Sequence, residues 1–524
     1  MKTTQLALVI LLTFNIFGQQ KYFTNPVIGG FNPDPSICRN GHDYYLVTSS
    51  FEFFPGVPVY HSKDLVNWKM ISYALTRNSQ LNLTNYMASD GIWAPTIRYC
   101  NGKYYMITTL VSRRPWKPKN FYVTATDPAG PWSEPIMVDE GGIDPDLFFD
   151  DNGKTYYLRN GGNGIDIAEI DLTTGKLLHA PVNIWAGTGA PYPEAPHMYK
   201  INGMYYLIIA EGGTGMYHQT SVARASSPLH VFKPYPHNPI LCHTKRHMHT
   251  IQATGHADII QAHDQSWWAV FLGKRSAGFE INNSLMGRET FLAPVNWTDD
   301  GWPIVGSGGF VELKMQAPAF FSQQQKSEKI RYDFSESNFP LAFNHIRNPV
   351  EKQYTLTEKP GWAGLSGCST SLSDAASPTF AGVRLQHIEA TVTTKMDFSP
   401  TKEGEEAGIT IYLDNKHYYS LSVTKSGKKS VFQVHKKASS IETKTPYSTH
   451  SKQISFLRLQ ISKTEIHFSV STDGKVFNEL ETAEAKMLYS PQYTGAYVGI
   501  YATGNGNVSK TKAWFDYFEY TPEK

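Results

Sequence analysis

The sequence predicts an all-β protein, a five-bladed β-propeller followed by a β-sandwich. The prediction depends on the composition, on a repeated aromatic pair in the N-terminal part and on alternating strands in the C-terminal part. Aromatic residues make up 13% of the 524 residues, and the chain contains 41 Gly and 31 Pro. This composition is typical of strands joined by many turns, and the length allows two or three domains.

A pair of adjacent aromatic residues recurs five times in the N-terminal part. The first members stand at positions 44, 104, 156, 205 and 267, and four of the pairs follow a turn that contains Gly. The intervals of 49 to 62 residues each leave room for a four-stranded sheet and its turns. Such sheets repeated around an axis form a β-propeller, so five blades are predicted. The pairs are Tyr44-Tyr45, Tyr104-Tyr105, Tyr156-Tyr157, Tyr205-Tyr206 and Trp267-Trp268.

One position in each repeat, ten to twelve residues before the aromatic pair, is predicted to face the propeller axis. The strand before the first hairpin turn is the innermost of a blade, so these side chains should meet at one mouth of the central channel. Pro follows four of the five positions within one or two residues, as expected where a strand begins. The residues at this position are Asp34, Trp93, Asp144, Glu194 and His256.

Three of the five axial residues are acids, which indicates a catalytic site. Like charges at close range raise one another's pKa. Hydrolysis of a glycosidic bond needs one carboxylic acid and one carboxylate, and a third acid can hold up the pKa of the proton donor. Taken singly, Asp34 and Asp144 could be turn residues before Pro, and Glu194 could be a surface acid. Their shared position in the repeat favours catalysis.

The charge balance and the cysteines exclude some other functions. The 48 Lys and Arg against 46 Asp and Glu give a net charge of +2, so no nucleic-acid partner is expected. The four cysteines lie too far apart for a CxxC metal pattern or a dense disulfide scaffold, and they are predicted to be free, buried thiols. They are Cys38, Cys100, Cys242 and Cys368.

Residues 1–18 are predicted to be a secretory signal peptide. Lys2 precedes an almost wholly apolar run from Leu6 to Phe17, and small Gly18 stands near a plausible cleavage point. The run is shorter than the ~20 residues that span a bilayer, and no Cys follows it for lipid attachment. We therefore expect an exported protein, periplasmic or secreted, without a membrane partner.

A polar stretch at 322–326 reads as a linker, so residues 19–325 are assigned to the propeller and 326–524 to the second domain. Beyond the linker, strands with alternating apolar residues are separated by turns such as Ser471-Thr472-Asp473-Gly474. That pattern predicts an all-β sandwich.

Several motifs, taken in their order along the chain, resemble those of glycoside hydrolase family 43. The resemblance extends from about Asn25 to the C-terminus. The similar members are exo-acting β-xylosidases and α-L-arabinofuranosidases, which combine a five-bladed propeller with a C-terminal, concanavalin-like β-sandwich. The motifs are Asn32-Pro33-Asp34-Pro35-Ser36, Ile143-Asp144-Pro145, Pro193-Glu194-Ala195-Pro196-His197, Gly255-His256-Ala257-Asp258 and Gly287-Arg288-Glu289-Thr290-Phe291.

The resemblance implies an inverting mechanism with three acids in separate roles. Asp34 would be the general base that activates water, and Glu194 the general acid that protonates the leaving oxygen. Asp144 would raise the pKa of Glu194 and orient it.

The resemblance also implies residues that bind the substrate. Arg288 would bind sugar hydroxyls, with a structural role between blades as the alternative. Trp93 and the cluster of Phe51, Phe53 and Phe54 are candidate walls of the sugar pocket, with Phe53 assigned to substrate binding and core packing as the alternative, because aromatic faces pack against the CH face of a sugar.

His256 is also a candidate for the pocket and for a metal. In the family this position lies on the axis, sometimes within reach of a metal through water. A single calcium ion there is a possibility, although a lone His is more often structural. No cofactor is needed for the chemistry. A loop of the second domain, within 367–380, is expected to close the pocket.

The predicted function is removal of non-reducing-end α-L-arabinofuranosyl residues from hemicellulose oligosaccharides, from xyloglucan or arabinoxylan, with β-D-xylosidase side activity. Alternatives are a β-D-xylosidase acting primarily on xylo-oligosaccharides and a noncatalytic sugar-binding propeller, which would not need all three acids intact. A retaining sucrose or fructan hydrolase is disfavoured because the sequence lacks the Asn-Asp-Pro-Asn-Gly motif expected of it.

Overall fold

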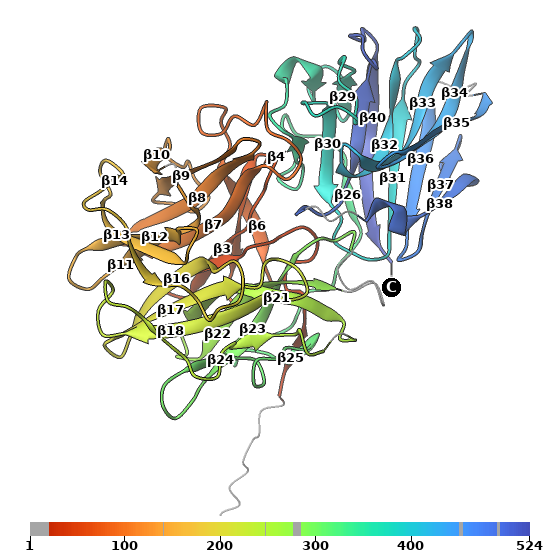
Figure 1. Ribbon diagram of the computed structural model, residues 1–524. Helices are drawn as coiled ribbons and strands as arrows, with labels where there is room; N and C mark the ends of the chain where they lie inside the picture. Colours follow the sequence, from red (N-terminus) through yellow and green to blue (C-terminus); the bar gives the residue numbers. More distant parts are fainter. Residues whose placement is uncertain are drawn as a thin grey trace, which may run out of the picture.

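The computed structural model describes residues 20–139, 141–246, 248–275, 284–449, 454–489 and 493–523, and these are almost entirely strands and turns (Figure 1). The helical elements in these ranges are two short 3₁₀ turns, η1 (Glu351–Gln353) and η2 (Ala485–Leu488). None of the described helical segments has the length and apolar character needed to cross a membrane. The predicted signal peptide, residues 1–18, lies outside the described residues.

The first domain is a β-propeller of antiparallel sheets, in each of which the strands pair largely in chain order. The first sheet is β2 (Ser36–Asn40), β3 (Asp43–Val47), β5 (Gly56–Ser62) and β6 (Lys69–Leu75). The second is β7 (Gly91–Cys100), β8 (Lys103–Arg113), β9 (Trp116–Ala125) and β10 (Ile136–Asp139). The third is β11 (Ile143–Phe149), β12 (Thr155–Asn160), β13 (Ile165–Asp171), β14 (Lys176–Leu177) and β15 (Val182–Trp185).

Two further sheets of the same kind follow. The fourth is β16 (Glu194–Ile201), β17 (Met204–Glu211), β18 (Gln219–Ala225), β19 (Lys233–Pro234) and β20 (Leu241–Cys242). The fifth is β21 (Ile251–Gln261), β22 (Trp267–Arg275), β23 (Glu289–Trp297) and β24 (Pro303–Val305). The ends of the domain are joined, because β1 (Tyr22–Thr24) pairs with β25 (Lys314–Gln316).

The repeated aromatic pair lies in the second strand of each sheet, and its two rings enter two different apolar clusters. Tyr104 packs between the first and second sheets, whereas Tyr105 packs between the second and third. Successive side chains of a strand point to opposite faces, and both faces of these sheets are covered by a neighbouring sheet. Trp267 and Trp268 divide in the same way, and the cluster of Trp268 also holds Tyr44 of the first sheet. The repeat therefore marks sheets that are buried on both sides.

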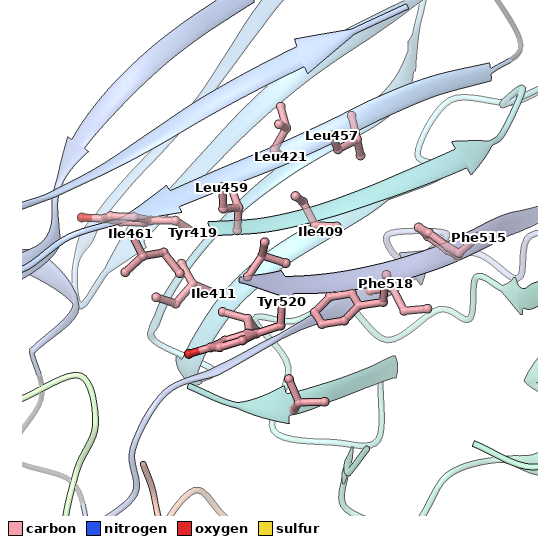
Figure 2. Close-up of a cluster of buried hydrophobic side chains, with 14 of the residues drawn as sticks. Ile409, Ile411, Tyr419, Leu421, Leu457, Leu459, Ile461, Phe515, Phe518 and Tyr520 are labelled. Atoms are coloured by element: carbon pink, nitrogen blue, oxygen red, sulfur yellow. The ribbon is translucent and has the colours of Figure 1, made fainter. Parts of the chain in front are cut away.

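The second domain is a sandwich of two sheets around one apolar core (Figures 1 and 2). The core contains Ile409 and Leu421 from one sheet and Leu457, Leu459 and Phe518 from the other (Figure 2). One sheet is β30 (Thr379–Arg384), β39 (Tyr497–Thr503), β32 (Glu406–Asp414), β33 (His417–Ser426), β34 (Lys429–Ala438) and β35 (Ile441–Thr449). The other is β26 (Ile330–Tyr332), β28 (Tyr354–Thr355), β29 (Ala363–Ser366), β40 (Lys512–Pro522), β31 (Ala390–Asp397), β36 (Ile454–Ile461), β37 (Glu465–Ser471) and β38 (Asn478–Glu484).

The two domains share backbone pairing and an apolar cluster. Strand β27 (His345–Ile346) of the second domain pairs with β4 (Phe53–Phe54) of the first. The ring of Phe53 stacks on Tyr497 with centroids 4.0 Å apart, and its side chain is fully buried. Arg384 Nε donates a hydrogen bond of 2.8 Å to the carbonyl oxygen of Phe31. The sandwich is therefore fastened to the propeller beside the start of its first sheet.

The four cysteines are free, as the sequence predicted. Cys38 and Cys368 are buried, whereas Cys100 and Cys242 are partly exposed, so burial holds for only two of them.

Replacing Phe53 should weaken the junction between the domains. Phe53→Ala removes a fully buried ring and is expected to lower the free energy of unfolding by about 3 to 5 kcal/mol. Urea unfolding followed by tryptophan fluorescence measures the loss. The control is Met137→Ala, because Met137 is 49% exposed. Equal effects of the two substitutions would contradict the structural role of Phe53.

Candidate active site

The structure brings the five axial residues together in one cavity of about 260 Å³. Four of them come from the beginning or the middle of the first strand of a different sheet, and Asp34 stands two residues before β2, the first strand of the first sheet. They are Asp34, Trp93, Asp144, Glu194 and His256, and the remaining lining residues are Phe51, Ala94, Ile143, Tyr192, Gly213, Thr214, His218, Arg288 and Tyr493.

The backbone is distorted where the first strands pass the cavity. Asp34, Asp144 and His256 have φ values of 55°, 55° and 54°, in the left-handed region. The pairing register also shifts around Asp144, Glu194 and His256. Bulges re-aim side chains, and left-handed backbone at residues other than Gly costs of order 1 to 3 kcal/mol each unless the surroundings hold it. The distortions thus turn the acids and the histidine toward the axis.

A buried ionic network lies directly behind these distorted positions. Arg98 of β7 places Nη1 2.8 Å from Asp258 and Nε 3.0 Å from Asp146. Its Nη2 lies 3.0 Å from Nδ1 of His197, and Ser36 Oγ donates to Asp258 over 2.7 Å. These five residues belong to five different sheets. We call them the Arg98 network.

The Arg98 network keeps its two carboxylates ionised. Burial alone would raise the pKa of Asp258 and Asp146, but the adjacent Arg98 guanidinium lowers both overall. Asp146 stands two residues after Asp144, and Asp258 stands two residues after His256. Each of the two ion pairs with Arg98 therefore fixes its strand at a position two residues away from a cavity residue.

Asp34 is held by two strong hydrogen-bond donors. Arg288 Nη1 lies 2.7 Å from its Oδ1, and Ser49 Oγ donates to Oδ2 over 2.6 Å. His256 Nδ1 is 3.7 Å from the same Oδ1. Arg288 also donates to Thr214 Oγ1 and to the carbonyl oxygen of Tyr493. The pairing with a guanidinium fixes the orientation of the Asp34 carboxyl group.

Glu194 and Asp144 have raised pKa values. Burial, and then the charge of Asp34, raise the pKa of Glu194 to about 7, against the effect of Arg288. Burial raises the pKa of Asp144 well above its usual range, and the charges of Glu194 and Asp34 add to the rise. Repulsion between neighbouring carboxylates is mutual, so the Asp144–Glu194 pair retains a proton at neutral pH.

The histidines of the cavity are neutral. Burial lowers the pKa of His256 to about 3 and that of His218 to about 4. Nε2 of His218 is buried and accepts or donates no hydrogen bond within the described part of the chain. The same is true of Nε of Arg288. Both residues line the cavity.

The aromatic wall of the cavity differs from the predicted one at one residue. Trp93 lines the cavity as expected, with its Nε1 donating to the carbonyl oxygen of Ser89 over 3.1 Å. Phe53 does not line it, because its ring is buried against Tyr497 in the domain junction. Phe51, from the same cluster in the sequence, lies in the wall with its ring centroid 5.9 Å from that of Trp93.

The second domain contributes Tyr493, and not the segment 367–380, to the cavity. The Tyr493 ring packs against Trp93 with centroids 5.4 Å apart. Gly367 and Cys368 line a separate groove between the domains.

The sequence offered no local signal for Tyr493, which lies far along the chain from the axial residues. Thr214 and His218 were missed as well, although Gly213-Thr214 follows a strand with an aromatic pair, and Gly255 leaves the space that the His218 ring fills.

Comparisons with known proteins agree with this architecture. Residues 23–303 match glycosyl hydrolases family 43, and residues 331–521 match the beta xylosidase C-terminal concanavalin A-like domain. The non-reducing end alpha-L-arabinofuranosidase BoGH43B of Bacteroides ovatus is 39% identical over 98% of both chains. A beta-xylosidase of Bacillus subtilis is 32% identical over 95% of this chain and 98% of its own. The solved structure of Bacteroides ovatus xyloglucan PUL GH43B covers 96% of this chain and 100% of its own, with 39% identity and a TM-score of 0.92.

The Arg98 network should be essential for stability. Arg98→Met leaves Asp146 and Asp258 buried without their cation, so the free energy of unfolding is expected to fall by about 3 to 5 kcal/mol. Arg77→Met is the matched control, because its pair with Glu134 is exposed to solvent and should contribute little to stability. Chemical denaturation of both variants makes the comparison. A loss at Arg98 no larger than at Arg77 would show that the network does not hold the sheets together.

Proposed function

This chain belongs to glycosyl hydrolase family 43, and we propose that it is an inverting exo-glycosidase that releases non-reducing-end α-L-arabinofuranosyl residues from hemicellulose oligosaccharides. The observation that carries the proposal is the cavity with three acids in two protonation environments. Asp34 is paired with Arg288, whereas Glu194 and Asp144 have raised pKa values. A glycosidase needs this division between a proton acceptor and a proton donor.

The size of the cavity supports exo action on a single sugar. A volume of about 260 Å³ lies just below the range of about 300 to 1,000 Å³ that is typical of ligand pockets. Tyr493 closes one side from the second domain, and its carbonyl oxygen is bonded to Arg288. One terminal sugar can enter, and the rest of the oligosaccharide stays outside.

The sugar and its parent polysaccharide are assigned by similarity. The relative from Bacteroides ovatus with 39% identity is an α-L-arabinofuranosidase, and the solved structure carries xyloglucan in its name. We therefore propose arabinofuranosyl units of xyloglucan or arabinoxylan as the substrate. β-D-Xylosidase activity is proposed as a side activity, because a relative at 32% identity is a β-xylosidase. A primary β-D-xylosidase is the second candidate for the same reason.

The proposed reaction uses the three acids in one displacement. Asp34 accepts a proton from water, and the water oxygen forms a bond to the anomeric carbon. The bond from that carbon to the leaving oxygen breaks, and Glu194 gives its proton to this oxygen. Asp34 is then protonated and Glu194 is ionised, and exchange of a proton with solvent restores both. Asp144 keeps the pKa of Glu194 high and orients it.

Arg288 has two tasks in this proposal. Its Nη1 orients Asp34 over 2.7 Å. Its buried Nε has no acceptor among the described residues, which suits a hydrogen bond to a sugar hydroxyl. His256 and Trp93 line the same cavity and are proposed to contact the sugar.

The chemistry of the family needs no cofactor. The residues around His256 do not fit a calcium ion. Among the described residues, no three or more His, Cys, Asp or Glu side chains are grouped so that they could hold a metal ion, and no step of the proposed reaction uses one. Ca²⁺ takes six to eight oxygen ligands, and the nearest carboxylate to His256, Asp34, is already bonded by Arg288 and Ser49.

The number of blades, the domain boundary and the export of the protein are also proposed. The five sheets and the apolar clusters between them support a propeller of five blades. The gap between β25 and β26 supports a domain boundary at residue 325, with 19–325 and 326–524 as the domains. Export after removal of residues 1–18 is proposed from the sequence alone.

Loss of the proposed acid should abolish cleavage of substrates with poor leaving groups. Glu194→Ala is expected to lower kcat by about 10²- to 10⁴-fold on arabinosylated oligosaccharides. Wild type and variant are compared on an aryl α-L-arabinofuranoside and an aryl β-D-xyloside as well, because an aryl leaving group needs less protonation.

Three outcomes would contradict the proposed function. Wild-type protein could cleave neither aryl glycoside, or Glu194→Ala could keep full activity on the oligosaccharide. NMR of the first-formed sugar could show a retained anomeric configuration, which would exclude Asp34 as a base acting on water.

The pH profile should follow the protonated form of Glu194. The residue donates a proton only while it holds one, so kcat/KM is expected to fall as the pH rises through about 7. Asp144→Asn removes the carboxyl group that shares the retained proton with Glu194, so the repulsion that resists loss of the last proton of the pair disappears and this alkaline limb should move to lower pH. Glu169→Gln, which changes the distant Lys154–Glu169 pair, is the control. A limb that stays in place in Asp144→Asn would contradict the role of Asp144.

A further inference from the structure

A large exposed aromatic side chain stands beside the cavity wall. Trp116 begins β9 and is 56% exposed. Its ring meets that of Trp93 edge to face, with centroids 6.0 Å apart and an interplanar angle of 67°. Trp93 in turn contacts Phe51 inside the cavity. A row of aromatic rings therefore leads from the cavity wall to solvent and ends at Trp116.

The hairpin that carries Trp116 is anchored on the cavity side. Arg113 lies opposite Trp116 in the β8–β9 register. Its Nε donates to Asp90 over 2.8 Å, and its guanidinium lies 5.8 Å from the centre of the Tyr493 ring. The neighbouring residue Ser89 accepts the hydrogen bond of the Trp93 indole. Segment 89–90 thus holds the Trp93 indole directly and anchors, through Arg113, the strand opposite Trp116, so the hairpin loses little conformational freedom when a ligand binds.

An exposed indole face suits a neutral sugar ring. The CH face of a pyranose can pack on the flat apolar surface of an aromatic ring while the hydroxyl groups stay hydrated. Exposed Trp is also uncommon, because the residue is highly buried on average. The cavity accommodates one sugar, so the next sugar of the substrate lies outside it, and Trp116 is an exposed ring in direct contact with the Trp93 wall.

We propose that Trp116 is a binding platform for the sugar that remains on the leaving oxygen, a neutral pyranose of the hemicellulose chain. This inference rests on the proposed exo-glycosidase function and adds a second contact to it. Trp116 selects oligosaccharides over small glycosides, and it takes no part in the proton transfers.

The test compares substrates that do and do not reach the platform. Trp116→Ala is expected to raise KM for an arabinosylated xylo-oligosaccharide about tenfold with little change in kcat. Inhibition by free L-arabinose, which occupies the inner cavity alone, should keep its wild-type constant. Trp116→Phe retains a smaller ring and should give an intermediate KM. Tyr22→Ala is the control, because Tyr22 is also exposed but lies on β1, beside β25.

Two results would overturn the inference while leaving the proposed function intact. KM for the oligosaccharide could be unchanged in Trp116→Ala. Alternatively, KM and the L-arabinose constant could rise together, which would mean that Trp116 supports Trp93 and binds no sugar. A wild-type protein that turns over neither arabinosides nor xylosides would instead contradict the proposed function, and the inference would fail with it.

Discussion

The contact of Arg98 with two buried carboxylates is the constraint on which the rest of the active-site architecture depends. One cation joins Asp146 of the third sheet to Asp258 of the fifth, while His197 and Ser36 connect the fourth and the first. The free energy gained by apolar packing between sheets is roughly proportional to the buried area and does not depend on direction. We interpret the Arg98 network as the directional element that sets how the sheets meet at the axis, where the backbone is distorted.

The network also explains how neighbouring acids of one strand reach opposite protonation states. Asp144 and Asp146 stand two residues apart on β11, and both are buried. Asp146 has Arg98 as a partner and a lowered pKa, whereas Asp144 faces Glu194 and has a raised one. Burial acts in the same direction on both groups, so the sign of each shift follows from the partner charge. The strand thus carries a structural anion and a proton-retaining acid within one pleat.

Much of this arrangement could be predicted from the sequence because it depends on short-range periodicity. The aromatic pairs mark strands buried on both faces, and the position ten to twelve residues before each pair identifies the five axial residues. Periodicity leaves open which ring of the cluster at 51–54 walls the pocket and which packs in the core, and Phe53 takes the core position. Strict alternation places Phe51 and Phe53 on one face, but Phe51 has a φ of 49° and leaves the alternating pattern. Tyr493 could not be predicted, because its position depends on how a second domain docks.

The docking of the second domain has a consequence for the order in which the protein becomes functional. Asp34, Asp144, Glu194 and Arg288 all precede the sandwich in the chain, yet Tyr493, which orients Arg288 and walls the cavity, is close to its end. During synthesis the acids emerge from the ribosome long before their pocket can close. A chain that stops before Tyr493 carries the catalytic groups without the enclosure, so the pocket is completed only after most of the sandwich has been made.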